Sequence, residues 1–507
     1  MQIRNVYFIY LRKNSVSKLK KNIEYFVENT KDYPIIFAIA AGLYAFVYVF
    51  ASNFMLVNSW FQLAVVFCVY IVFPVVIFSV SWEVSKRLKF LHKFQQYVLP
   101  VLNAMFFGFY FVGRIYSFQH KKMMLLTVVI AALLAIGLRK QYKKIIVLQF
   151  IMAFVAFATM IPTLYKAMFD ADEWRSFPEE VVQTKFTQFP NIYVIQPDGY
   201  VNFTELGKDP YNFQNGEFEA YLQNSGFKLY KDFRSNYTST ILSNGSMFSM
   251  KQHYKGEQLF GAREVIAGKN PVIETLKNNE YETFLFIENP YVLLNRPEIQ
   301  YDYCNFSMDE VPWFGIGAFG MRKEMIQPLA ETIKKQQGKR SFYFIEKILP
   351  GHISTFKSAS KGAATERENY LTQVKKANEW LKEITEVIIQ NDPNSLIVIA
   401  ADHGGYVGFD YTKQFFQKQT DEKLVYSGFS AALAIKWPNK QAPSYDAQLK
   451  TPVNLFRTVF AYLGDNEALL DNKEEDASYS IITNGILGSV YKYIDADGKV
   501  VFEEVER

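Results

Sequence analysis

Five apolar runs of membrane-spanning length dominate the first third of this chain. They cover residues 34–57, 60–82, 95–118, 123–138 and 145–169. Each is close to the about 20 residues that a helix needs to cross a hydrocarbon core of about 30 Å, and the fourth is the shortest. A cleavable signal peptide would start earlier and have a shorter apolar core than the first run. We therefore expect a domain of five transmembrane helices over residues 1–169.

Lysine and arginine predict how these helices are oriented. The N-terminal segment "RKNSVSKLKKN" and the loops "EVSKRLKFLHK" and "RKQYKK" are basic, which places them in the cytoplasm. Five spans that begin in the cytoplasm place all residues after 169 on the extracytoplasmic side. One basic loop, "RIYSFQHKK", falls on the outer side in this count. Its lysines either snorkel at the membrane interface or form a rim that attracts phosphate near the lipid headgroups.

Charge and cysteine content exclude some alternatives. The formal net charge of +5 is small for 507 residues, and no long basic stripe lies outside the membrane loops. Nucleic acid is therefore not an expected partner. Cys68 lies in the second apolar run and Cys304 in the later part, so we expect no disulfide within a domain.

The composition changes after the last apolar run. Residues 170–190 are polar, acidic and broken by two prolines, as in a linker or an amphipathic helix. From residue 191 to 507, short β-rich runs alternate with helical patterns. Strands are expected at "NIYVIQ", "ETFLFI", "SFYFIEKI", "LIVIAA" and "AALAIKW". This alternation predicts an α/β domain with a mostly parallel sheet.

Two of these expected strands end in a similar way. "NIYVIQ" is followed by Pro197, Asp198 and Gly199, and "LIVIAA" leads into Asp402 and His403. In parallel sheets, chemistry collects at the carboxyl ends of the strands. Two carboxylates and an imidazole at neighbouring strand ends suit one divalent metal ion, with the imidazole favouring zinc or manganese. The alternative is an ordinary turn at Asp198 and a helix cap at the second motif.

A run of hydroxyl residues offers a nucleophile. In "SNYTSTILSNGSMFSM", residues 235–250, hydroxyl groups crowd together just before an apolar, helix-like stretch. The N–H groups at a helix N-terminus attract anions, and a nearby metal ion can activate a hydroxyl for attack on phosphorus. The alternative is a Ser or Thr cap without chemistry.

The stretches "PNIYVIQPDGY", "SNYTST" followed by "MFSM", and "ADHGG" together resemble the alkaline phosphatase superfamily, in its membrane-anchored sulfatase-like branch. That branch includes lipoteichoic acid synthases and lipid A phosphoethanolamine transferases, which have five membrane spans and an extracytoplasmic catalytic domain. The resemblance covers nearly the whole chain. It implies an alkaline-phosphatase-like fold, held in the bacterial cytoplasmic (inner) membrane with residues 191–507 on the periplasmic or extracytoplasmic side.

The resemblance also implies roles for individual residues. Asp198, Asp402 and His403 match the metal ligands, and Thr240 matches the threonine nucleophile, which would also contact the metal. His352 in "LPGHISTF" resembles a histidine that contacts the substrate phosphate, although relatives often continue with proline where Ile353 stands. A histidine in a solvated loop is the alternative.

One more histidine remains. His253 in "KQHY" matches no motif of the family and is kept as a candidate at the rim of the substrate site.

The implied activity is a two-step transfer. Thr240 would take a phospho-headgroup, of the phosphoethanolamine or phosphoglycerol type, from a membrane phospholipid and pass it to an envelope glycan or a lipid-linked acceptor. No C-x-P-x-R or S-x-P-x-R motif surrounds Thr240, so the formylglycine of true sulfatases cannot form. A phosphodiesterase or phosphatase with the same site, and a degenerate non-enzymatic member, stay open as alternatives.

Overall fold

The computed structural model describes residues 18, 20–52, 59–115, 121–169, 173–255, 259, 261–315, 317–482 and 489–505. The chain forms two compact units, Met1–Phe169 and Asp170–Arg507.

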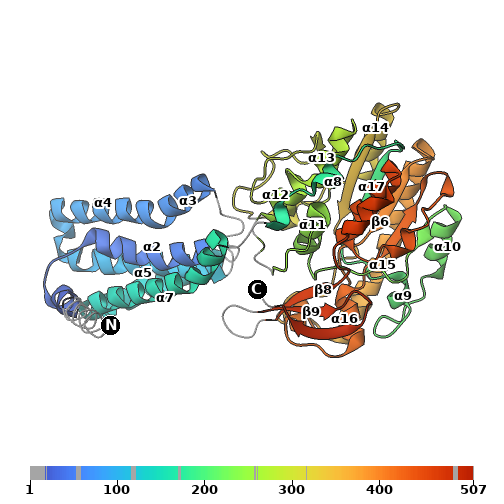
Figure 1. Ribbon diagram of the computed structural model, residues 1–507. Coiled ribbons are helices and arrows are strands. Elements are labelled where there is room, and N and C mark those ends of the chain that lie inside the picture. The colour runs from blue at the N-terminus through green and yellow to red at the C-terminus, as the bar shows by residue number, and fades with distance from the viewer. Residues whose placement is uncertain are drawn as a thin grey trace, which may run out of the picture. The chain divides into compact units, whose positions relative to one another are not determined.

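The first unit is built from helices (Figure 1). Its elements are α2 (Pro34–Ser52), α3 (Trp60–Phe67), a π-helical turn (Cys68–Val72), α4 (Phe73–Arg87), a 3-10 turn (Lys89–Phe94), α5 (Gln95–Ile115), α6 (Lys121–Gly137), a 3-10 turn (Arg139–Gln141) and α7 (Tyr142–Phe169). The π-helical turn makes α3 and α4 one continuous segment. It passes so close to α2 that a Cβ atom on Gly42 would lie 1.6 Å from the carbonyl oxygen of Tyr70.

Four helical segments of the described chain are long and apolar enough to cross a membrane. They are Pro34–Ser52, Trp60–Arg87, Lys89–Gly113 and Arg139–Pro162. The sequence predicted five, and the missing one coincides with α6, which has 17 residues. At 1.5 Å per residue α6 spans about 25 Å, which is shorter than a hydrocarbon core of about 30 Å. Of the basic loop before α6, His120 and the side chain of Arg114 lie outside the described residues.

A buried polar network ties three helices of this unit together. The Asn103 amide donates to the Phe37 carbonyl oxygen at 2.7 Å and to Gln149 Oε1 at 2.9 Å. Gln149 donates back to Asn103 Oδ1 at 2.9 Å, and the Tyr142 hydroxyl donates to the same oxygen at 2.9 Å. Side-chain amides that satisfy one another between apolar helices hold those helices in register. The network thus links α2, α5 and α7.

The second unit is an α/β domain around a seven-stranded sheet. Its strands are β1 (Ile192–Pro197), β2 (Lys228–Leu229), β3 (Glu282–Ile287), β4 (Tyr303–Cys304), β5 (Ser341–Lys347), β6 (Leu396–Ala400) and β7 (Leu433–Lys436). They lie in the order β2-β7-β6-β1-β5-β3-β4. β6, β1, β5, β3 and β4 are parallel, whereas β7 and β2 pair antiparallel. The mostly parallel sheet predicted from the sequence is therefore confirmed.

Helices and short turns connect the strands of this sheet (Figure 1). The longest, α15, buries the stripe of side chains that its sequence pattern predicted, from Tyr370 to Ile388. The helices of this unit are α8 (Glu179–Val182), α9 (Phe203–Leu206), α10 (Gly216–Asn224), α11 (Thr240–Ser249), α12 (Ala262–Ala267), α13 (Pro271–Asn278), α14 (Ile326–Lys335), α15 (Ala363–Asn391), α16 (Glu422–Phe429) and α17 (Leu455–Gly464).

Two features of this unit lie outside the sequence prediction. A second, antiparallel sheet follows the main one, with β8 (Ser478–Ile482), β9 (Ser489–Ile494) and β10 (Val500–Glu504) in the order β10-β9-β8. Part of the expected linker also packs into the unit, because Trp174 and Val181 are buried. The Thr275 hydroxyl donates to the carbonyl oxygen of Val181 at 3.4 Å.

Candidate active site

Two adjacent parallel strands bring the acidic residues together. β1 pairs with β6, with Ile195 opposite Ile399, so the two strands end at the same edge of the sheet. Asp198 directly follows β1, and Asp402 and His403 follow β6. The sheet order, which the sequence alone does not give, makes these strand ends neighbours.

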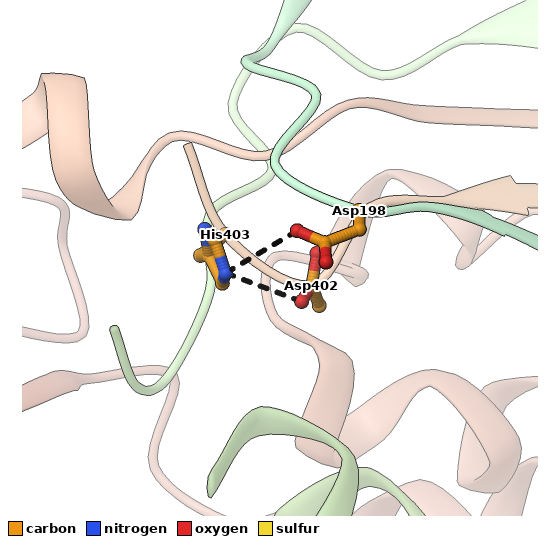
Figure 2. Close-up of side chains that lie close together, drawn as sticks. All are labelled: Asp198, Asp402 and His403. Carbon is orange, nitrogen blue, oxygen red and sulfur yellow. Dashed lines mark ion pairs between the residues drawn. The ribbon is translucent and has the colours of Figure 1, made fainter. Parts of the chain in front are cut away.

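Figure 2 shows the three side chains pointing toward one another. His403 Nε2 lies 3.3 Å from Asp402 Oδ2 and 3.7 Å from Asp198 Oδ1. One possible ligand atom from each residue lies within 4.8 Å of the other two. We call Asp198, Asp402 and His403 the acidic cluster.

Burial makes this cluster costly without a cation. Asp198, Asp402 and His403 are 7%, 2% and 2% exposed. Asp198 Oδ1 and Asp402 Oδ2 are buried and accept no hydrogen bond from the described residues. Buried carboxylate oxygens without partners are unfavourable unless a cation compensates them. Two carboxylates and one imidazole fit the ligand preference of a divalent ion such as zinc or manganese.

Hydrogen bonds fix the orientation of two candidate ligands, His403 and Asp402. His403 Nδ1 lies 2.8 Å from the carbonyl oxygen of Gly404, and since a carbonyl only accepts, Nδ1 carries the proton. In the neutral ring this leaves the lone pair of Nε2 facing the carboxylates. The backbone N–H of Gly199 donates to Asp402 Oδ1 at 3.0 Å, which leaves Oδ2 directed at the cluster.

The charges in the cluster shift its pKa values. Burial, followed by the charge of Asp402, raises the pKa of Asp198 to about 7. Burial by itself would lower the pKa of His403, but the charges of Asp402 and Asp198 outweigh it and raise that pKa. The cluster without metal therefore holds protons that a bound cation would displace.

Close backbone packing explains the glycine beside each strand end. Gly199 has a φ of +70°, and a Cβ atom there would lie 2.2 Å from the carbonyl oxygen of Gly351. A Cβ atom on Gly404 would lie 2.3 Å from the carbonyl oxygen of Ser427. Only glycine allows these approaches without displacing the backbone.

Thr240 is the hydroxyl residue that the structure places next to the acidic cluster. It begins α11, and its Oγ1 lies 3.5 Å from His403 Nε2. Ser239 is the N-cap, with extended backbone and no capping hydrogen bond from its side chain. Thr238 is buried, and its carbonyl oxygen accepts a hydrogen bond from the Tyr406 hydroxyl. Thr240 also has the unpaired N–H groups of a helix N-terminus beside it.

His352 lies at the edge of the same site. It follows β5, it is exposed to solvent, and its ring centre lies 5.9 Å from that of His403. His352 Nδ1 lies 2.6 Å from the carbonyl oxygen of Ile353, so Nε2 is left for another partner. Displacement of water by surrounding protein atoms lowers the pKa of His352, and the nearby His403 adds to the effect. A neutral imidazole is therefore expected there near pH 7.

The structure does not place His253 at a rim. Its side chain is 5% exposed, and its ring stacks on Tyr237 with centroids 3.8 Å apart. Nε2 donates to the carbonyl oxygen of Leu242 at 3.1 Å, and Nδ1 accepts from the backbone N–H of Lys255 at 3.0 Å. Both ring nitrogens are used inside the domain, so His253 packs as a structural residue.

A family model described as Sulfatase matches residues 205–465, which is more than half of the chain. The chain belongs to the sulfatase family. Thr240, His352, Asp402 and His403 lie within the matched range, and Asp198 lies just before it. No curated protein sequence matches this chain.

Several solved structures resemble this sulfatase-family chain at low identity. The C-terminal periplasmic domain of EcEptC from Escherichia coli, in complex with Zn, has 8% identity and a TM-score of 0.43, covering 61% of this chain and 93% of that one. The lipoteichoic acid synthase LtaP from Listeria monocytogenes has 14% identity and a TM-score of 0.39, with 64% and 91% covered. The C-terminal periplasmic domain of phosphoethanolamine transferase EptC from Campylobacter jejuni has 13% identity and a TM-score of 0.36, covering 54% of this chain and 89% of that one. Scores this low identify neither a substrate nor a reaction.

The sequence analysis missed a buried acid close to the acidic cluster of this sulfatase-family domain. Glu346 lies on β5 opposite Gln196 of β1, and its Oε1 accepts from the Gln196 amide at 3.3 Å and from the Tyr291 hydroxyl. Burial, followed by the charges of Asp198 and Asp402, raises the pKa of Glu346 far above its usual range. The signal was a carboxylate inside the apolar strand "SFYFIEKI", where a charged side chain needs a specific reason.

Proposed function

We propose that this protein is a membrane-anchored transferase. It moves a phospho-headgroup, of the phosphoethanolamine or phosphoglycerol type, from a membrane phospholipid to an envelope glycan or a lipid-linked acceptor. The observation that carries this proposal is the position of Thr240, whose hydroxyl lies 3.5 Å from His403 of the acidic cluster, at the N-terminus of α11. A hydroxyl between N–H groups and a cation site is suited to attack on phosphorus.

The acidic cluster would hold one divalent ion, zinc or manganese. Asp198, Asp402 and His403 would be its ligands, and the Thr240 hydroxyl would complete the set. When bound, such an ion lowers the pKa of a hydroxyl ligand and offsets charge on phosphoryl oxygens. The buried, unpaired carboxylate oxygens of Asp198 and Asp402 support this assignment.

The chain's own residues supply the transfer. In the first step Thr240 Oγ1 forms a bond to phosphorus, the bond from phosphorus to the diacylglycerol oxygen breaks, and the proton lost by the threonine ends on that oxygen. His352, with its free Nε2 at the edge of the site, takes up the proton of the threonine and delivers it to that oxygen, and while it is protonated it also holds the phosphate. In the second step an acceptor hydroxyl attacks phosphorus, the bond to Thr240 breaks, and the threonine regains a proton.

The residue at the nucleophile position argues against sulfate esters. Formylglycine is made from cysteine or serine within a C-x-P-x-R or S-x-P-x-R motif, and the residues around Thr240 read "TSTILSNG". A family match therefore does not make this chain a sulfatase. Threonine remains a hydroxyl nucleophile, and it suits a transfer through a covalent phosphoester.

The helical unit fits a lipid donor. Four candidate spans, with α6 as the proposed fifth, would anchor the catalytic domain at the outer face of the bacterial cytoplasmic membrane. The donor headgroups lie at the same face. A domain held at the membrane meets its lipid substrate at a high effective concentration.

The test is to trap the covalent intermediate. Full-length protein, loaded with zinc or manganese in vesicles of phosphatidylethanolamine and phosphatidylglycerol, should carry a phospho-group on the peptide that contains Thr240. The mass of the adduct would identify the headgroup. Thr240→Ala protein is the matched control and should carry none.

Other outcomes of this test would contradict the proposal. An adduct on another residue, or turnover of labelled lipid by the Thr240→Ala protein, would rule out Thr240 as nucleophile. Release of the headgroup into water at the same rate with and without glycan acceptors would make the protein a hydrolase.

A further inference from the structure

A large basic cavity lies within the helical unit. Its volume is about 870 Å³, within the range of about 300–1,000 Å³ typical of ligand pockets. Three separate chain segments line it, 27–32, 82–96 and 139–144. These follow or coincide with the three segments whose basic character predicts a cytoplasmic location, and the fold brings them to one place.

The cavity is rich in cations. We call Lys93, Arg139, Lys140, Lys143 and Lys144 the basic set, and two carboxylates, Glu28 and Asp32, also line the cavity. This excess of positive charge suits an anionic ligand.

The hydrogen-bond and ring partners of two members of the basic set are neutral groups. Lys143 Nζ donates to the backbone carbonyl oxygen of Asn29 at 2.6 Å and to its side-chain oxygen at 3.0 Å, and it lies 5.4 Å from the ring centroid of Tyr33. Arg139 donates to the Tyr97 hydroxyl and lies 4.9 Å from the centre of that ring. Neutral oxygens and rings orient these cations but do not neutralise them. The Asp32 carboxylate interacts electrostatically with Lys143, but two carboxylates do not offset the five cations of the basic set, so net positive charge stays available to a ligand.

The position of the cavity suits a lipid headgroup. It is lined by the chain just before α2, by the segment between α4 and α5, and by the turn that leads from α6 into α7. These are helix ends, where a bilayer changes from hydrocarbon to polar headgroups. Basic pockets between membrane helices on the cytoplasmic side bind anionic lipid headgroups.

We propose that this cavity binds the phosphate headgroup of an anionic phospholipid, such as phosphatidylglycerol or cardiolipin, in the cytoplasmic leaflet. The site rests on the proposed membrane placement of the helical unit and not on the transfer reaction. The cavity lies where α2 starts and where α4 joins α5 and α6 joins α7. The proposed lipid donor binds elsewhere, at the acidic cluster of the other unit.

The test measures lipid retained by full-length protein. Protein extracted from membranes that contain phosphatidylglycerol and phosphatidylethanolamine is examined by native mass spectrometry, with and without millimolar inorganic phosphate. Two pairs of substitutions are made in the basic set, Arg139→Gln with Lys143→Gln, and Lys140→Gln with Lys144→Gln. The second pair removes exposed lysines and keeps the contacts to Asn29 and Tyr97. The matched control is Lys18→Gln with Lys21→Gln, which removes the same charge from two exposed lysines that do not line the cavity.

The wild type and the control should retain phosphatidylglycerol, and each pair in the basic set should retain about thirtyfold less, since each lysine or arginine near an anionic surface contributes roughly fivefold. Inorganic phosphate should not displace the lipid. Equal retention in all variants would overturn the site. An equal loss of lipid in the control would show that the lipid is held by bulk charge attraction. Displacement of the lipid by inorganic phosphate would show a site for free anions. Either outcome would also overturn the proposed lipid site. Lost transfer activity with retained lipid would affect only the proposed reaction.

Discussion

Thr240 Oγ1 lies 3.5 Å from Nε2 of His403, although 163 positions separate the two residues in the chain. The contact joins the first residue of α11 to the loop that follows β6. It places a hydroxyl beside an acidic cluster whose buried carboxylate oxygens lack hydrogen-bond partners. A candidate nucleophile beside a candidate cation site defines a testable active site.

Removing a member of the acidic cluster should remove the metal. Asp402→Asn and His403→Ala should each weaken zinc or manganese binding by more than about a hundredfold, because even the partners that orient metal ligands contribute 10–100-fold. Activity should fall in parallel while helix content persists. Metal content by mass spectrometry of the purified full-length protein measures this. Glu368→Gln, which removes an exposed carboxylate of α15, should keep its metal. Full occupancy in both cluster variants would disprove the ligand assignment.

Neighbouring hydroxyl residues should differ sharply in importance. Thr240→Ala should lower turnover of labelled lipid by at least about a thousandfold, since loss of a covalent nucleophile removes the main chemical route. It should keep part of its metal. Ser239→Ala should keep substantial activity, because the Ser239 side chain makes no capping hydrogen bond. Comparable activity of the two variants would argue against Thr240 as nucleophile.

The pH dependence of metal binding follows from Asp198. Its pKa is raised to about 7, so the metal-free folded protein holds this proton in a range where the unfolded chain has lost it. The raised pKa of Asp198 contributes to the free energy of unfolding of the metal-free protein. This stabilising contribution is fully present below about pH 4 and is lost as pH rises to about 7. A metal needs the deprotonated carboxylate, so affinity should rise about tenfold per pH unit well below pH 7, and more steeply where the proton of His403 is displaced as well.

Calorimetric titration of the full-length protein with zinc between pH 5.5 and 8 would measure this, and proton release should appear as a dependence of the heat on the buffer. The stabilisation that zinc gives should also grow over the same interval. An affinity that does not change with pH would show that Asp198 is already ionised in the metal-free protein.

Topology can be checked with two engineered cysteines. Five spans place Lys376 on α15 outside and Lys89 inside, and both side chains are exposed. Lys376→Cys should react with a membrane-impermeant maleimide in cells whose outer barrier is permeabilised, and Lys89→Cys should react only after lysis of the inner membrane. The native Cys304 should react weakly, because burial raises the pKa of its thiol to about 11.

Protection of both engineered cysteines until lysis would show that α6 does not cross the membrane. The chain would then have four spans, and the catalytic domain would lie on the cytoplasmic side.

The sequence by itself determined the parts that depend on neighbouring residues. Apolar runs of spanning length, strands such as "LIVIAA", and the buried stripe of α15 are local patterns, because helix and strand periodicity is set by residues a few positions apart. The polar residues that end β1 and β6 were visible for the same reason.

Only the tertiary structure decided which of these local features meet. The order β6-β1-β5 sets Asp198 beside Asp402, and the packing of α11 brings Thr240 to His403. Packing also buried His253 against Tyr237 and gathered basic segments far apart in the chain around one cavity. Which elements pack together depends on the free energy gained when their surfaces bury one another. That free energy comes from residues far apart in the sequence, so no local sequence pattern predicts it.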